Sequence, residues 1–158
     1  MRISRRAAAL VAAVITGLAT LGAAGAAFAS SSAPRANNGV QVLRLRADFV
    51  AFALNDAGHG GPGDVRAALF AIRTPGGARA GKESVSTVGI PGHQSLAHSA
   101  FVLKGGQIDA MGSVAETATR FTVAIIGGTG IYEGVTGQIR NVILPSGSFD
   151  LTFFIIRP

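Results

Sequence analysis

After residue 39 the chain consists of short apolar runs that are separated by clusters of glycine and proline. Of all the features of the sequence, this pattern most restricts which fold the chain can adopt. Few of these runs are long enough for a helix. The glycines and prolines between them supply the backbone angles that tight turns need. The pattern predicts eight strands, at Gln41–Leu54, Val65–Arg73, Glu83–Ile90, Ser95–Leu103, Gln107–Glu116, Arg120–Ile126, Val135–Leu144 and Ser148–Ile156. We therefore expect an all-β chain in which helix is nearly absent.

Alternation of side chains supports the first of these strands. From Leu43 to Phe49 the odd-numbered residues are apolar, whereas Arg44 and Arg46 lie on the other face. After Asp48 the second face becomes apolar as well. This change indicates either a β-bulge or a stretch that is buried on both sides.

The last strands point to a closed sheet. Residues 120–126 and 151–156 are apolar on both faces, and only 14% of the chain is charged. A closed barrel accommodates such strands, with an apolar interior and a subunit contact outside. The Gly105-Gly106 pair between two strands predicts a hairpin. We predict an eight-stranded antiparallel β-barrel over residues 40–158.

The N-terminal residues have the order of a secretory signal peptide. Arg2, Arg5 and Arg6 precede an uncharged apolar run, and Ala27-Phe28-Ala29 forms an Ala-x-Ala cleavage site. We expect residues 1–29 to be removed after Ala29, residues 30–39 to be a flexible leader, and the mature protein to be secreted without stable membrane insertion. The alternative is a retained membrane anchor, because the uncharged stretch is long enough to span a bilayer.

Charge and residue types exclude several classes of function. The net charge of +6 includes three arginines of the predicted signal, and the other eleven basic residues are dispersed, which argues against a nucleic-acid partner. Without cysteine there is no disulfide and no zinc-thiolate site, and the histidine spacings match no metal motif. A nucleotide-binding loop at Gly128–Gly134 would need a helix directly after it, and Gly134 and Gly137 would interrupt such a helix. We therefore interpret Gly127–Gly130 as a turn rather than a nucleotide loop. We predict no metal and no cofactor.

Two polar residues share a strand face with apolar ones. His98 lies on the same face as Leu96 and Ala100, which predicts that it points into an apolar interior. It is a candidate ligand-binding or catalytic residue, and the alternative is a hydrogen-bonded core histidine. Asn141 lies between Ile139 and Ile143 on one face, where it either orients a ligand or satisfies a neighbouring backbone group.

Three further residues are candidates for the rim or the interior. Asp64 follows a glycine-rich stretch and precedes a strand, and Arg66 shares its face; the alternative for Asp64 is a turn-forming role. Tyr132, the only tyrosine, follows the Gly127–Gly130 segment, and its amphipathic ring suits a barrel mouth. No serine, histidine and aspartate arrangement or close pair of carboxylates indicates a catalytic group.

The segment Phe121–Gly137, with Gly-Gly-Thr-Gly at 127–130 and then Ile131 and Tyr132, resembles the allene oxide cyclase and dirigent superfamily, most strongly its bacterial barrel-like members. The segments at 63–64, 101–112 and 150–155 fit the same pattern. The resemblance implies an eight-stranded antiparallel barrel, assembled as a homodimer or homotrimer. Dirigent proteins carry basic residues after this loop, whereas Ile131, Glu133 and Thr136 stand here, so the plant lignan-type activity is not implied.

The same resemblance implies a function by confinement. An apolar cavity that holds a reactive molecule in one conformation promotes its cyclisation or isomerisation with few catalytic groups. We therefore expect a secreted barrel that binds a small hydrophobic molecule and steers such a reaction, as a cyclase or isomerase. The alternative is a non-catalytic secreted barrel whose outer face mediates interactions, and the sequence alone leaves both open.

Overall fold

The computed structural model describes residues 20–21, 39–55 and 61–158. The predicted signal peptide and leader lie almost entirely outside these ranges, as do His59 and part of the predicted turn at residues 58–63. Within the described ranges there is no helix, and hence none that is long and apolar enough to cross a membrane.

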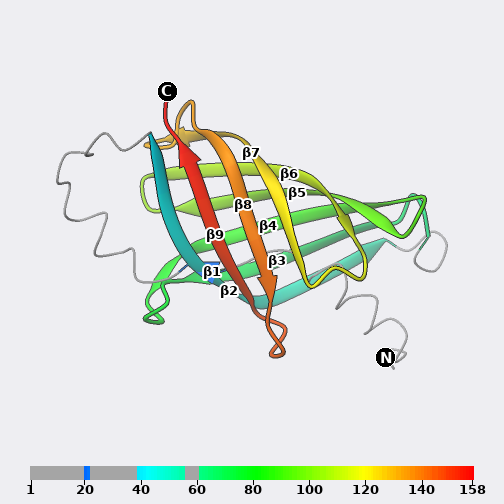
Figure 1. The fold of residues 1–158 in the computed structure, drawn as a ribbon. Coiled ribbons are helices and arrows are strands. Elements are labelled where there is room, and N and C mark those ends of the chain that lie inside the picture. Colours follow the sequence, from blue (N-terminus) through cyan, green and yellow to red (C-terminus); the bar gives the residue numbers. More distant parts are fainter. Residues whose placement is uncertain (1–19, 22–38, 56–60) are drawn as a thin grey trace.

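The described chain is one antiparallel sheet that closes on itself (Figure 1). Its strands are β1 (Thr20–Leu21), β2 (Val40–Asn55), β3 (Val65–Arg73), β4 (Arg79–Ile90), β5 (Gln94–Leu103), β6 (Gly106–Ala115), β7 (Arg120–Gly130), β8 (Thr136–Ile143) and β9 (Phe149–Ile156). Neighbours in sequence pair in order, and β2 also pairs with β9. The short β1 pairs with β2 beside this closure. The predicted eight-stranded antiparallel barrel is therefore confirmed as β2–β9.

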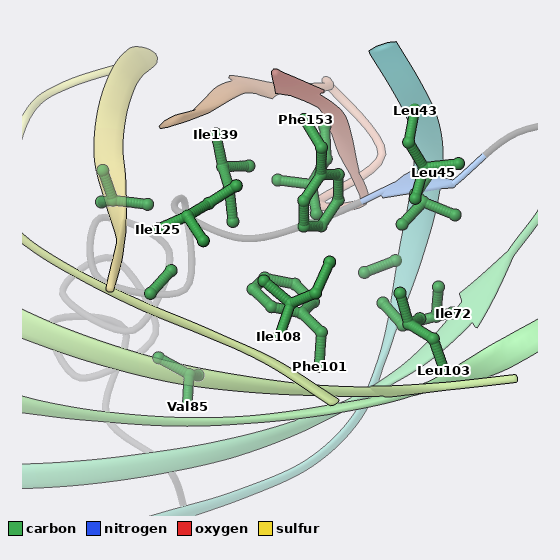
Figure 2. Close-up of a cluster of buried hydrophobic side chains, with 14 of the residues drawn as sticks. Leu43, Leu45, Ile72, Val85, Phe101, Leu103, Ile108, Ile125, Ile139 and Phe153 are labelled. Atoms are coloured by element: carbon green, nitrogen blue, oxygen red, sulfur yellow. The ribbon is translucent and has the colours of Figure 1, made fainter. Parts of the chain in front are cut away.

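Alternate residues of each strand point into the barrel and form its core. In β2 these are Leu43, Leu45 and Ala47, each at most 2% exposed. Figure 2 shows side chains from both walls meeting inside, with Phe153 of β9 directed toward Phe101 of β5. Their rings pack edge to face with centroids 5.1 Å apart. Such contacts between opposite walls are what a closed sheet makes possible.

The break in alternation within β2 is a β-bulge. The register between β2 and β3 shifts between Phe49 and Ala51, so one extra residue is inserted into β2. The alternative, a stretch buried on both sides, is wrong, because Val50 is 54% exposed and Leu54 is 41% exposed. Beyond the bulge Phe52 is the residue that packs against the core.

The Gly127–Gly130 segment is a strand end rather than a turn, which corrects our interpretation. Its residues pair with Gly106–Asp109 of β6, and the turn follows at Ile131–Gly134. Gly130 has φ +62°, and a Cβ there would overlap the carbonyl oxygen of Gly105. Glycine is needed here because the β5–β6 hairpin and the end of β7 approach each other closely.

The barrel has two ends that differ in chemistry. We call one the Asp64 end; it comprises Asp64, the β4–β5 turn at 91–93 and the β6–β7 turn at 116–119. The two turns are joined by the hydrogen bond from Glu116 N to His93 O (2.9 Å). We call the other the Tyr132 end; it comprises the β5–β6 turn and the β7–β8 turn, joined by the hydrogen bond from Ile131 N to Gly105 O (3.0 Å).

Candidate functional site

A set of polar side chains lies inside the barrel among the apolar ones. Each is at most 4% exposed, and most come from the wall formed by β3, β4 and β5. The same wall carries small inward residues, such as Ala68 and Ala97. The polar set consists of Asp64, Arg66, Glu83, Thr87, Ser95, Ser99 and Asn141.

An ion pair reaches across the wall at the Asp64 end. Arg66 lies on β3 and Glu116 directly follows β6, so β4 and β5 lie between them in the sheet. Arg66 Nη1 is 3.7 Å from Glu116 Oε1, and both side chains are largely buried. The exposed His93 adds a contact of 3.8 Å from its Nδ1 to Glu116 Oε2. At 3.7 Å the pair is electrostatic rather than a full hydrogen bond, so the guanidinium keeps donors to offer.

Glu83 places a carboxyl group deep in the apolar interior. It lies on β4 directly opposite Phe70 of β3 and Phe101 of β5, and it is fully buried. Burial raises the pKa of Glu83 well above its usual value, and the nearby Ser99 hydroxyl lowers it only in part. Neither carboxyl oxygen has a hydrogen bond of good geometry to a described residue. The raised pKa favours the protonated carboxyl, which donates a hydrogen bond.

The structure brings the predicted Asp64 and Arg66 to the same end of the barrel. Asp64 Oδ2 accepts a hydrogen bond from Gly61 N (2.9 Å), which is the turn-forming role. Asn141 is inward and fully buried on β8, and its Nδ2 donates to Ile139 O at 3.2 Å. The amide of Asn141 thus satisfies a backbone group, while its Oδ1 has no partner among the described residues.

The expected interior position of His98 is wrong. His98 is exposed on the outer face of β5, together with Leu96, which is 43% exposed. The inward face of β5 instead carries Ser95, Ala97, Ser99, Phe101 and Leu103. Because both faces of this strand contain apolar residues, alternation shows which residues share a face but not which face is inside.

Tyr132 lies at an end of the barrel, where its amphipathic ring was expected, but it is buried there. Tyr132 is 1% exposed and packs in the core at the Tyr132 end. Gly128 allows this, because a Cβ there would lie 2.9 Å from Tyr132 Cβ. Burial raises the pKa of the Tyr132 phenol, and the charge of Arg157 lowers it in part.

Sequence reasoning missed five residues of the site, which are Glu83, Thr87, Ser95, Ser99 and Glu116. Glu83 stands between Lys82 and Ser84 in a strand with polar residues on both faces, so nothing local marks it as buried. Its alternation with Val85 and Gly89 is the one signal that could have suggested an inward position. Glu116 lies at the end of β6, and only the fold brings it to Arg66.

An open depression of ≈ 490 Å³ lies on the outer face over β2–β5. Two cross-strand rows of mostly small outward residues form its floor, Ala53–Ala67–Ser86–His98 and Ala51–Leu69–Ser84–Ala100. Beside it runs an exposed apolar row made of Val65, Val88 and Leu96, which are directly opposite one another. His98 therefore belongs to a surface feature and not to the interior.

In the part of the chain that the structure describes, no group of three or more metal-ligating side chains comes together. No protein-family model matches the chain, and no curated protein matches it in sequence. Similarity appears only in comparisons of solved structures.

Three solved structures illustrate this similarity. A pyocyanin demethylase matches with a TM-score of 0.66 and 20% identity, over 73% of this chain and 99% of its own. A pterocarpan synthase dirigent protein matches with a TM-score of 0.63 and 12% identity, over 81% of this chain and 96% of its own. The Diels–Alderase AbmU from Streptomyces koyangensis matches with a TM-score of 0.55 and 18% identity, over 99% of this chain and 82% of its own.

These proteins share the closed antiparallel barrel described above, and at such low identity the likeness concerns the fold. The chain therefore has the closed eight-stranded antiparallel barrel fold that these three structures share.

Proposed function

We propose that the protein is an exported barrel that binds a small hydrophobic molecule in its interior and steers the cyclisation or isomerisation of that molecule. The observation that carries the proposal is the polar set inside an otherwise apolar barrel, with several hydrogen-bonding atoms left without described partners. Buried polar atoms are normally paired, and exceptions call for water or a ligand. Solved barrels of the same fold include a Diels–Alderase and a pterocarpan synthase dirigent protein, which supports a reaction of this kind.

The proposed chemistry needs few groups. The aromatic and aliphatic walls hold the ligand in a folded conformation. The loss of entropy on reaching the reactive conformation is then met by binding free energy before the reaction begins. Glu83 is the residue we assign to the reaction. Its protonated carboxyl donates a hydrogen bond to an oxygen that gains negative charge during bond rearrangement, in a setting from which water is excluded.

Filling the interior tests this proposal. Ala97 is inward and 4% exposed, so Ala97→Phe places a ring inside the barrel, whereas Ala124→Phe places one on the outer face of β7. Native mass spectrometry of the protein from its culture medium should show a retained small molecule in the wild type and in Ala124→Phe. The folded Ala97→Phe variant should have lost it. Empty wild-type protein, or ligand retained by folded Ala97→Phe, would contradict the proposal.

Export rests on the first 29 residues, so it is tested separately. N-terminal sequencing of the secreted protein should begin at Ser30, and Ala29→Leu should leave the uncleaved chain in the membrane fraction. A protein that stays in the cytoplasm would contradict the export proposal without affecting the interior site.

The outer face favours a second candidate function, contact with another copy of the chain. The apolar row Val65–Val88–Leu96 lies beside the depression over β2–β5 and leaves large side chains exposed. Contiguous exposed apolar surface is typical of interaction sites. A homodimer or homotrimer would cover this surface, and it is compatible with ligand binding inside.

A further inference from the structure

Buried hydrogen-bond donors without acceptors gather at the Asp64 end of the barrel. Both terminal nitrogens of Arg66 and the hydroxyls of Thr87 and Ser95 have no hydrogen-bond partner among the described residues. Each of these side chains is at most 4% exposed. A donor left unpaired away from water is costly, and proteins relieve the cost with ordered water or a bound ligand.

The three side chains face the same part of the interior. Arg66 and Thr87 lie directly opposite each other on β3 and β4. Thr87 is opposite Ala97 on β5, and Ser95 is the next inward residue along that strand. Because the guanidinium reaches from β3 toward Glu116 beyond β6, it passes over the wall that carries both hydroxyls. We call these three residues the donor cluster.

Charges of both signs surround the donor cluster. Glu116 faces the guanidinium at 3.7 Å, and Asp64 is buried beside it with Oδ2 held by Gly61 N. A carboxylate ligand would be attracted by Arg66 but repelled by the two acidic side chains. An ammonium ligand would be attracted by the acidic side chains but repelled by Arg66, and it offers no acceptor to the unpaired guanidinium nitrogens. A neutral oxygen that only accepts hydrogen bonds meets neither penalty.

We propose that the donor cluster binds a neutral acceptor oxygen of the ligand, such as that of a ketone, ester or ether, and that the protein thereby selects neutral hydrophobic molecules over charged ones. This inference rests on the proposed function, because it specifies the ligand of the same interior. Glu83 lies four residues from Thr87 along β4, about 13 Å at the rise of a strand. The donor cluster is therefore a second recognition point, distinct from Glu83.

Three probes of equal chain length test the selection. Isothermal titration calorimetry of the purified protein should show octan-2-one binding about tenfold or more tightly than octanoate or octylamine at neutral pH. Thr87→Val keeps the side-chain shape and removes the hydroxyl, so it should weaken octan-2-one binding about two- to tenfold. Thr122→Val, on the exposed face of β7, is the matched control and should not change it. If Thr87→Val does not fold, Ser95→Ala makes the same test.

The outcomes separate this inference from the proposed function. If octanoate or octylamine binds as tightly as octan-2-one, the barrel binds hydrophobic molecules but the selection is wrong. If octan-2-one is preferred but neither Thr87→Val nor Ser95→Ala weakens it, the donor cluster is not the binding point. If none of the three probes binds, the proposed function fails and the inference fails with it.

Discussion

At the scale of single residues, the interior owes its chemistry to a few polar side chains held among apolar ones. Glu83 is the clearest case, since it lies between two phenylalanines of neighbouring strands with no full hydrogen bond from a described residue. Such a group costs stability when it ionises. Its retention in a position that an apolar residue would fill is consistent with a role in binding rather than in folding.

This cost predicts a pH dependence of stability. In the unfolded chain Glu83 ionises near its usual pKa of 4.5, whereas the folded chain keeps the proton to higher pH. The free energy of unfolding should therefore fall as pH rises above about 4.5, by at most about 1.4 kcal/mol per pH unit, until the raised pKa is passed. Glu83→Gln cannot ionise and should lack this decline. Thermal unfolding between acidic and mildly alkaline pH measures the difference.

The control for this prediction is Glu133→Gln, a change in an exposed turn, which should keep the wild-type pH profile. If Glu83→Gln also keeps that profile, the carboxyl of Glu83 does not carry the pH dependence.

At the scale of elements, the ends of strands decide how the barrel closes. The bulge in β2 lets residues before and after it both direct apolar side chains inward, Ala47 on one side and Phe52 on the other. At the end of β7 the glycines let the backbone approach β6 and the turn that contains Tyr132. These are places where the backbone geometry, and not the hydrophobic pattern, fixes the residue type.

Substitutions at two glycines with similar φ angles distinguish the cost of backbone strain from the cost of disturbing a close backbone contact. Gly130 (φ +62°) lies against the carbonyl of Gly105, whereas Gly147 (φ +79°) has no atom within 4 Å of a Cβ position. Gly147→Ala should cost about 1–2 kcal/mol, from the left-handed conformation alone. Gly130→Ala should cost about 3–4 kcal/mol because it also separates the hairpin from β7. Equal costs in urea unfolding would contradict the close approach.

At the scale of the whole molecule, the barrel has an apolar interior and an outer face with exposed apolar side chains. A shallow region of small residues lies beside the row Val65–Val88–Leu96 on the side formed by β2–β5. A sheet closed on itself has no free edge along its barrel strands, so side-chain faces are the natural surface for association.

This surface predicts self-association. The wild-type protein should sediment as a dimer or trimer, and Leu96→Glu should shift it toward the monomer, because a carboxylate would be buried in the contact. Thr122→Glu, on the outer face of β7, is the control and should leave the assembly unchanged. Sedimentation velocity over a range of concentrations measures this, and a monomeric wild type would contradict the prediction.

The sequence by itself determined which segments of the chain form strands. Turn residues and short apolar runs predicted all eight barrel strands, and Val65–Arg73 matches to the residue, because these signals are local. The same reasoning named Arg66 and Asn141 as candidate polar residues of the rim or interior, and both are buried in the structure. It misplaced His98 because a strand that is apolar on both faces carries no local mark of its inner side.

Only the tertiary structure decided what lies together inside the barrel. The pairing of Arg66 with Glu116 joins residues from strands separated by two others, and the setting of Glu83 depends on the register of β3, β4 and β5. Closure through β2 and β9 then determines which face becomes the interior. The alternating runs of glycine and apolar residues are thus enough to predict a barrel, but its candidate site arises from contacts that no local pattern contains.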